Sequence, residues 1–168
     1  MKQSSTLNLS VLMPHPLEGV EDLLIRRDLA YDRPIDDEIV AETAGQWNTL
    51  KLWYRWEESL GVLVMTCAME SKTPTAQRTR LYPLLAAMNE KLWLGHFDVS
   101  SEDGVVMFRY SLMLREGEEA SPHLLEALLD VAVTECDRAY PALQAVLWGS
   151  KPVEEALSMA LFETCGEA

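Results

Sequence analysis

The sequence predicts an α+β fold in which an antiparallel sheet of about five strands packs against helices, in the order α-βββ-α-ββ-α-α. Apolar residues make up 48% of the 168 residues and charged residues 24%, which is ordinary globular usage. Two segments, 47–56 and 105–115, alternate their side chains with a period of two, whereas segments 16–30, 73–95 and 121–148 carry apolar residues at helical spacing. We find no linker between them. One domain over residues 15–168 is therefore expected after a mobile tail at residues 1–14.

The first helix is expected over residues 16–30. Leu17, Val20 and Leu24 recur at helical spacing, and acidic residues stand near the N-terminal end, where the helix dipole favours them. After Pro34 the period changes, and residues 38–43 are expected to form a short strand that ends in a turn at residues 44–46.

The strongest strand prediction is residues 47–56, which are rich in aromatic side chains. Alternation places one set on one face, namely Leu50, Leu52, Tyr54 and Trp56. It places the other set on the opposite face, namely Trp47, Thr49, Lys51, Trp53 and Arg55. Residues 62–70 follow as a third strand that is apolar on both faces, so these three strands are expected to form a meander.

The second helix is expected to begin at Thr73 as N-cap with Pro74 in its first position, and to end at Gly95. Its apolar stripe consists of Leu81, Leu85, Met88 and Leu92. Pro83 falls inside this segment, which predicts a kink or a later start because proline cannot donate the helical hydrogen bond.

The last two strands are expected at residues 96–100 and 105–115, joined by a hairpin turn at Asp103-Gly104. A third helix is expected from Ser121-Pro122 to Tyr140-Pro141, continuing with a bend to Trp148. A short final helix should follow Pro152 and fade by Gly166. In the core we expect four side chains above all: Leu85, Met88, Leu92 and Phe108.

The charge balance restricts the partners. The chain has 27 acidic and 14 basic residues, a formal net charge of −13 at pH 7. This field repels phosphate backbones and anionic lipid, so neither nucleic acid nor a membrane surface is expected as a partner. Residues 1–13 lack the apolar stretch of a signal peptide, and no later segment has eighteen uninterrupted apolar residues. The expected location is the cytoplasm.

Cys67, Cys136 and Cys165 are odd in number and far apart in the sequence. This spacing suits neither a disulfide framework nor a zinc site. We expect reduced thiols, with no two close enough to bridge.

The other candidates for chemistry are equally scattered. His15, His96 and His123 have no partner at metal-ligand spacing, and the acidic clusters at residues 36–38, 57–58 and 116–119 coincide with turns, where polar residues belong. No catalytic residue, metal or cofactor is predicted, and the protein is not expected to be an enzyme.

One pattern favours a function. In the two long strands, basic residues alternate with adaptable apolar ones, as Lys51, Trp53 and Arg55 and as Met107, Arg109 and Met113. If both strands lie in one sheet, these six side chains combine into a basic contact surface bearing Met and Trp, provided that the register matches the two faces. The alternative is a solvated face with stray apolar residues.

Several motifs resemble those of a known family. They are the run from Leu84 through Asn89-Glu90-Lys91-Leu92-Trp93-Leu94-Gly95-His96-Phe97, with Tyr31-Asp32-Arg33-Pro34, Thr134-Glu135-Cys136, Val146-Leu147-Trp148-Gly149 and the ending Glu163-Thr164-Cys165-Gly166-Glu167-Ala168. Together they resemble the YbjN-domain family, which is described as sensory transduction regulators. The resemblance implies a fold similar to type III secretion chaperones, often dimeric, and it transfers no catalytic residue.

Three functional hypotheses follow. The first is a protein-binding module, chaperone-like or regulatory, that holds a peptide segment or a partner domain. The second is a structural homodimer without a separate client. The third, an enzyme of unrecognised type, is least favoured because no constellation of residues assembles a site.

Overall fold

The structure is a computed structural model that describes residues 15–115 and 118–162. The tail predicted at residues 1–14, Cys165 and the last family motif lie outside these residues. The first half of the described chain contains α1 (Glu18–Arg26), β1 (Tyr31–Ile35), β2 (Glu38–Ala44), β3 (Thr49–Glu57), the 3₁₀ turn η1 (Glu58–Leu60) and β4 (Val62–Lys72). The second half contains the 3₁₀ turn η2 (Thr75–Gln77), α2 (Arg78–Asn89), β5 (His96–Val99), β6 (Val105–Met113), α3 (Pro122–Leu147) and α4 (Val153–Phe162).

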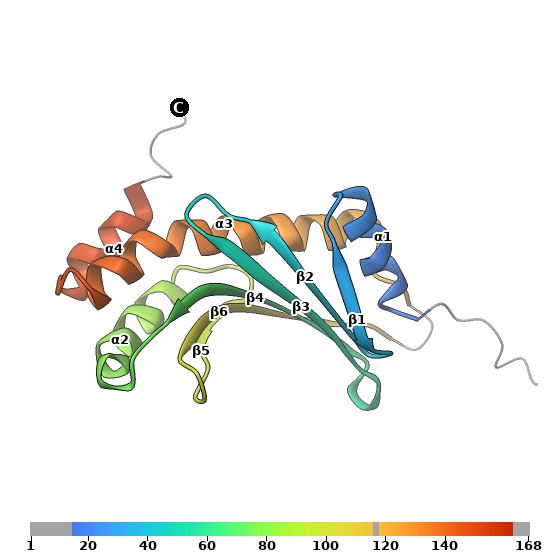
Figure 1. Ribbon diagram of the computed structural model, residues 1–168, viewed down its shortest axis with the longest axis horizontal. Helices are drawn as coiled ribbons and strands as arrows, with labels where there is room; N and C mark the ends of the chain where they lie inside the picture. The colour runs from blue at the N-terminus through green and yellow to red at the C-terminus, as the bar shows by residue number, and fades with distance from the viewer. Residues whose placement is uncertain (1–14, 116–117, 163–168) are drawn as a thin grey trace, which may run out of the picture.

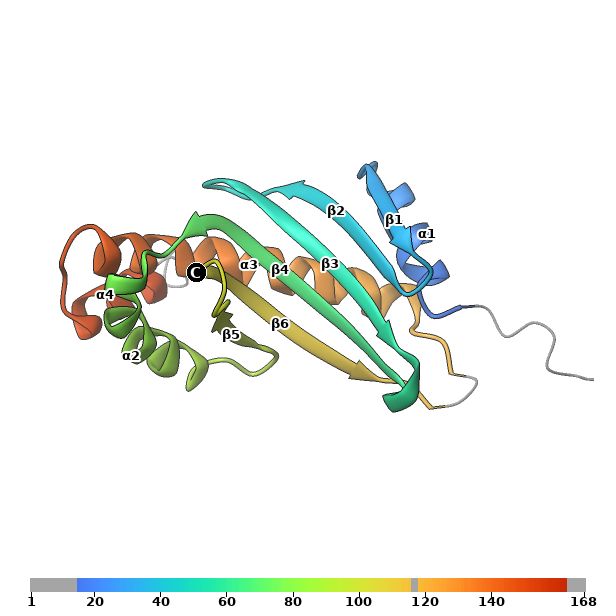
Figure 2. The same ribbon diagram turned by 60° about the horizontal axis from the view of Figure 1, so that its bottom comes forward.

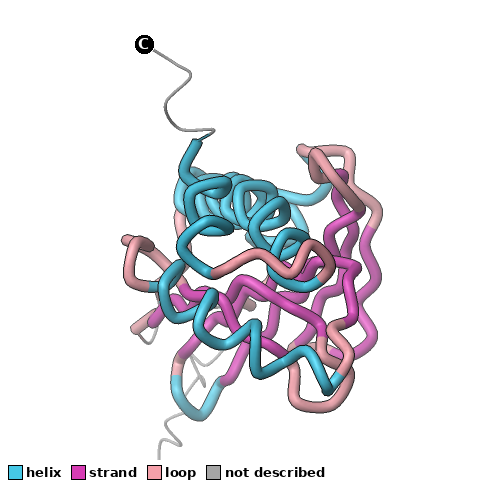
Figure 3. The backbone as a smooth tube through the Cα atoms, turned by 90° about the vertical axis from the view of Figure 1, so that its left-hand side faces the viewer, coloured by secondary structure: helices cyan, strands magenta, loops and turns pink. Residues whose placement is uncertain are grey.

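The strands form one six-stranded antiparallel sheet in the order β1-β2-β3-β4-β6-β5. The long helix α3 crosses one face of this sheet, with α1 at one end and α2 and α4 at the other (Figure 1). Seen along the molecule from the α2 and α4 end, helices lie above the strands and also in front of them (Figure 3). The predicted α+β class is confirmed.

The core lies between the sheet and α3, which packs against β4 and β6. We call the sheet face toward α3 the inner face. Cross-strand register brings Leu52, Cys67 and Phe108 into one row on this face, and all three are fully buried. Alternation predicted that Leu50, Leu52 and Tyr54 of β3 share one face. All three are buried, and the face they share is the inner face.

The sheet has one strand more than the three predicted before α2. The additional strand is β1, at the sheet edge, where Pro34 falls in a part of the strand with an irregular register. Proline is tolerated there because an edge strand needs only one row of hydrogen bonds. The predicted first helix is correspondingly shorter, ending at Arg26.

The second helix begins later than its predicted N-cap. Thr73 is buried without capping the helix, a 3₁₀ turn follows, and α2 starts at Arg78. Of the two consequences predicted from Pro83, a kink or a later start, the structure shows a later start, although Pro83 still lies inside the helix, in its second turn. The predicted core is confirmed for Leu85 and Met88 of α2, and also for Phe108 of β6.

Leu92 is only partly buried, because α2 already ends at Asn89. The segment that follows instead completes the sheet edge. The Asn89 amide donates to the Phe97 carbonyl oxygen at 3.0 Å and accepts from the Phe97 N–H at 2.7 Å, so it substitutes for a neighbouring strand at β5. Trp93, between these two residues in sequence, is 99% exposed.

The predicted cap of the third helix is confirmed. The Ser121 hydroxyl accepts from the Leu124 N–H at 3.2 Å, and Pro122 takes the first helical position. The helix continues through Pro141 to Leu147, a span of 26 residues. None of the described helices is long and apolar enough to cross a membrane.

Candidate protein-contact face

The sheet face opposite α3 is here called the outer face, and no described helix covers it. Turning the molecule so that this face comes forward shows the strands in front and α3 behind them (Figure 2). Its central row is Trp53 of β3, Thr66 of β4 and Arg109 of β6, which are Cα partners across the sheet. The rows on either side of it are Lys51 with Ala68 and Met107, and Arg55 with Val64 and Ser111. The row beyond Arg55 consists of Glu57, Val62 and Met113.

The structure therefore places all six predicted contact residues on one side of one sheet. Trp53 is only partly buried, so its indole is not sealed inside the monomer. Met113 is 76% exposed and Arg55 is also exposed, at the end of the face near η1. That these residues bind a partner stays a prediction.

A groove of about 380 Å³ runs over the outer face beside Trp53. Its lining residues are Glu38, Trp53, Arg55, Glu57, Leu60, Val64, Thr66 and Arg109. Trp53, Val64 and the 69% exposed Leu60 supply apolar surface, while the guanidinium groups of Arg55 and Arg109 supply positive charge. The groove can accept an apolar side chain with an acidic group beside it.

Each base of the outer face stands near an acidic residue. Lys51 Nζ lies 3.9 Å from Glu42 Oε1, and Arg55 Nη2 lies 3.8 Å from Glu57 Oε2. Arg109 Nη1 lies 3.6 Å from Asp98 Oδ2. The face is thus balanced in charge rather than basic, in contrast to what the six residues alone suggest.

These three ion pairs are long. Donor–acceptor distances of 2.7–3.2 Å mark a hydrogen bond to nitrogen, so none of the three bases is held by one to its acidic neighbour. Arg27, outside this face, shows the contrast, because its Nη2 lies 2.8 Å from Asp130 Oδ1. Bases on the outer face consequently keep donors that a partner can use.

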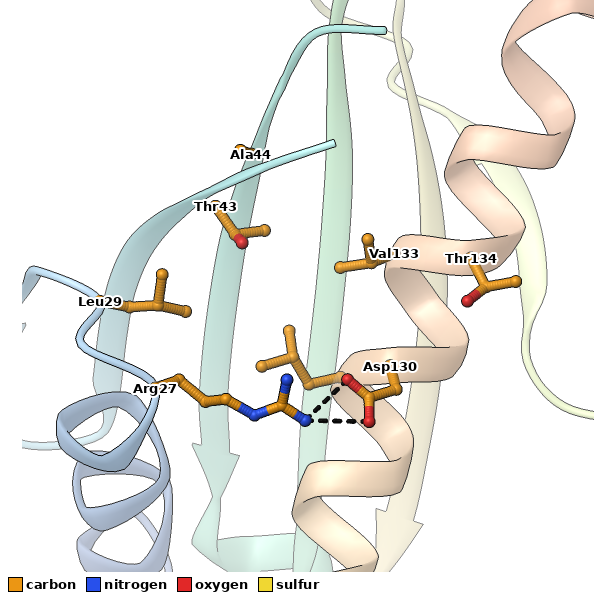
Figure 4. Close-up of a pocket in the computed structure, with 8 residues that line it drawn as sticks. Arg27, Leu29, Thr43, Ala44, Asp130, Val133 and Thr134 are labelled. Atoms are coloured by element: carbon orange, nitrogen blue, oxygen red, sulfur yellow. Dashed lines mark hydrogen bonds and ion pairs between the residues drawn. The ribbon is translucent and has the colours of Figure 1, made fainter. Parts of the chain in front are cut away.

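A second cavity, of about 350 Å³, lies beside α3. Arg27 bridges its rim from the end of α1 to Asp130 of α3, with Leu29, Thr43 and Val133 on its walls (Figure 4). The Arg27 Nε atom also donates to Glu126 at 3.0 Å. Because the guanidinium is committed to two carboxylates of α3, we assign it to fixing α1 against α3 rather than to a ligand.

The histidines are not brought together. His15 Nε2 is 3.0 Å from Asp37 Oδ1, His96 is opposite Arg109 on β5, and His123 is exposed in the first turn of α3. Within residues 15–115 and 118–162, no three His, Cys, Asp or Glu side chains are grouped so that they could hold a metal ion.

Two of the three cysteines do meet, contrary to the expectation drawn from their spacing. Cys136 Sγ of α3 lies 3.6 Å from Cys67 Sγ of β4, and both are free thiols. The hydrogen bond to Cys67, followed by burial, raises the pKa of the Cys136 thiol well above its ordinary value. The contact between Cys67 and Cys136 could not be predicted from their positions in the sequence, because the contact depends on how α3 crosses the sheet.

Sequence reasoning also missed other residues of the contact face. Leu60, Val64 and Thr66 line the groove, and the acids beside the three bases come from β2, β3 and β5. The available signal was the alternation of residues 62–70, but every residue there except Glu70 is apolar or small. Only the observed register shows which of them share a row with Trp53.

Comparisons with known proteins agree with this fold. The family model "YbjN: Putative bacterial sensory transduction regulator" matches residues 16–145, well over half of the chain. The crystal structure of YbjN from E. coli, described as "a putative transcription regulator", is similar over 92% of this chain and 93% of that chain, with a TM-score of 0.51 and 10% sequence identity. That likeness shows a common fold. None of the curated proteins matches the chain.

Proposed function

This chain belongs to the YbjN family, whose model carries the description "Putative bacterial sensory transduction regulator". From that premise we propose that it is a non-enzymatic regulatory protein that binds a partner protein through its outer face. The observation that carries the proposal is the groove beside Trp53, open on a sheet face that no described helix covers. A chaperone-like mode of action and a cytoplasmic location belong to the same proposal.

The groove suits a short segment with one apolar anchor between two carboxylates. The anchor would contact Trp53 and Val64, while Arg55 and Arg109 would donate to the carboxylates. Tryptophan and arginine dominate binding energy at protein interfaces because they combine large area with directed hydrogen bonds. The long ion pairs of these two arginines leave those donors free in the unbound protein.

The net charge of the chain limits how acidic such a segment can be. With a formal charge of −13, the protein repels a polyacidic run at long range. At physiological ionic strength this repulsion is screened beyond about 8 Å, whereas a contact pair is screened less. Two carboxylates placed at the arginines therefore fit better than an extended acidic tract.

Defined peptides test the proposal. Short N-acetylated, fluorescently labelled peptides carry a central Leu flanked on both sides by Glu, by Gln or by Lys, and binding is read by anisotropy. The Glu peptide should bind roughly tenfold more tightly than the Gln peptide, since two charge-assisted contacts contribute about 1.4 kcal/mol together. The Lys peptide should bind weakest. Raising the salt concentration should narrow these differences.

Two variants locate the binding surface. Trp53→Ala should abolish binding of the Glu peptide, while Trp93→Ala, which removes an indole exposed elsewhere, should leave it unchanged. The double variant Trp53→Ala, Arg109→Glu must remain folded by circular dichroism. Equal binding of all three peptides, or unchanged binding by this double variant, would contradict the proposal.

A second copy of the chain is the alternative occupant, as in the homodimer hypothesis. Sedimentation velocity separates the two occupants. A dimer that Trp53→Ala converts to a monomer, together with no binding of the Glu peptide by the unsubstituted protein, would show that the outer face serves self-association instead.

A further inference from the structure

The two core thiols form a pair that the proposed binding function does not use. Cys67 is central in β4 and Cys136 lies midway along α3, and both side chains are fully buried. Their sulfur atoms are 3.6 Å apart, and the Cys136 thiol is also 3.6 Å from the Cys67 carbonyl oxygen. The contact joins the sheet to the helix that covers it.

This distance is van der Waals contact between unbonded sulfurs. A disulfide bond measures about 2.05 Å, so the two sulfurs need to approach by roughly 1.5 Å to bond. The partners of Cys67 across the inner face are Leu52 and Phe108. A shift of that size is within the reach of small changes in side-chain torsion and helix position, without any change in topology.

We propose that Cys67 and Cys136 form an oxidative modification site, in which a hydroperoxide converts the two thiols into a disulfide bond between β4 and α3. In the first step the sulfur of Cys67 attacks one peroxide oxygen, the O–O bond breaks, and Cys67 becomes a sulfenic acid while the other oxygen leaves as an alcohol or water. In the second step the sulfur of Cys136 attacks the Cys67 sulfur. The S–O bond breaks, and the hydroxyl group leaves with the Cys136 proton as water.

The geometry assigns Cys67 to the first step. Cys136 Sγ lies 3.6 Å from both Cys67 Sγ and the Cys67 carbonyl oxygen, and the hydrogen bond to Cys67 together with burial raises the pKa of the Cys136 thiol, so Cys136 is not assigned the first attack. Cys136 keeps its proton until the sulfenic acid is present. It then acts as the resolving thiol, because a nearby thiol condenses with a sulfenic acid.

Burial of the two thiols limits the rate at which they react with a hydroperoxide. Both sulfurs lie beneath α3, so even hydrogen peroxide, the smallest hydroperoxide, reaches them only when the helix moves locally away from the sheet. The site therefore stays reduced under a low peroxide concentration and reacts under a sustained one. The product ties two residues 69 positions apart in the sequence, and a link over so long a loop restricts the unfolded chain.

The full chain carrying Cys165→Ser is the protein for the test, because that change leaves only the proposed pair. It is incubated natively with hydrogen peroxide, alkylated in denaturant and analysed by mass spectrometry. We expect loss of two hydrogens, no alkyl adduct, a cross-linked peptide containing Cys67 and Cys136, and full reversal by dithiothreitol. The oxidised protein should also unfold at a higher urea concentration than the reduced protein.

Single variants test the order of the steps. In Cys136→Ala, dimedone should trap a sulfenic acid on Cys67, whereas in Cys67→Ala the remaining thiol should stay unmodified for the same time. Two alkylatable thiols after peroxide treatment, or sulfinic acids instead of a disulfide, would overturn the modification site. Dimedone labelling of Cys136 but not of Cys67 would overturn the assigned order. Peptide binding plays no part in these readouts, so they stand apart from the proposed function.

Discussion

The two faces of the sheet are made by the same strands, yet they are built for different environments. On β6, Phe108 is fully buried on the inner face, while its neighbour Arg109 lies on the outer face with a long ion pair. On β4, Cys67 is buried against α3 while Thr66 lines an open groove. Alternation along a strand thus separates a stabilising surface from one that is free for contact.

The comparison also predicts that substitutions on the two faces affect different properties of the protein. Inner-face residues should change stability when they are substituted, because their neighbours cannot fill the space. Outer-face residues should change binding and leave stability nearly unaltered. The predictions below test this division, from the largest expected effect to the smallest.

Phe108→Ala should give the largest loss of stability. Removing a fully buried ring from the centre of the inner face should lower the free energy of unfolding by about 3–5 kcal/mol, measured by urea denaturation. The matched change at the next residue, Arg109→Ala, should stay within about 0.5–1 kcal/mol because it loses only an exposed pair. Similar losses at both positions would erase the distinction between the faces.

Gly95→Ala should cause the second largest loss of stability. Gly95 has φ +66°, and an added Cβ would lie 2.3 Å from Phe108 Cζ and 2.7 Å from the Arg109 carbonyl oxygen. The left-handed conformation alone costs about 1–2 kcal/mol for alanine, and the contact with the buried ring adds to this. Gly19→Ala in α1 serves as the control, because alanine favours a helix and the nearest atom, the Leu125 Cδ1 methyl, is 3.2 Å away, much farther than the Phe108 ring is from Gly95.

Asn89→Ala should lower the stability less than the two preceding substitutions. It removes the two hydrogen bonds that close the free edge of β5 at Phe97, and unsatisfied backbone groups there should lower stability by about 1–2 kcal/mol. Hydrogen exchange provides the sharper measurement, since the Phe97 amide should exchange faster while inner-face amides of β3 should not. An unchanged rate at Phe97 would show that the side chain does not protect the edge.

Tyr54→Phe should have the smallest effect at neutral pH, within about 0.5 kcal/mol, because the buried Tyr54 hydroxyl has no hydrogen-bond partner among the described residues. Burial, and secondarily the charge of Cys67, raises the pKa of Tyr54 above its ordinary value. Above pH of about 10 the unfolded state loses this proton while the folded state keeps it, so stability falls as the pH rises. Urea unfolding at pH 7 and at about pH 10.5–11 should show a smaller loss of stability at alkaline pH in Tyr54→Phe than in the unsubstituted protein.

Much of this division could be predicted from the sequence. Strict alternation in residues 49–56 and 105–113 specified which side chains share a face, and Ser121-Pro122 specified where α3 begins. The prediction was wrong for Trp47, which precedes β3 and stacks on Tyr140 of α3 instead of sharing the face of Lys51 and Trp53. Strand β1 could not be predicted in the same way, because an edge strand containing Pro34 needs neither two apolar faces nor a full ladder of hydrogen bonds.

The candidate site was predictable only in part. Its six residues follow from local alternation, but the acids that balance Lys51, Arg55 and Arg109 come mostly from neighbouring strands, and their pairing depends on register. The contact between Cys67 and Cys136 depends on where α3 crosses the sheet, which no local pattern encodes.

The central claim, that the outer face is the contact surface, is tested most directly by the indole N–H resonances of the five tryptophans. Trp53 lies on the outer face, Trp47 stacks on Tyr140 of α3, and Trp93 and Trp148 are exposed elsewhere. Titrating the nitrogen-15 labelled protein with the Glu-flanked peptide should shift the Trp53 resonance progressively and leave those of Trp47, Trp93 and Trp148 in place. A Trp53 resonance that stays fixed while Trp93 or Trp148 moves would contradict the account.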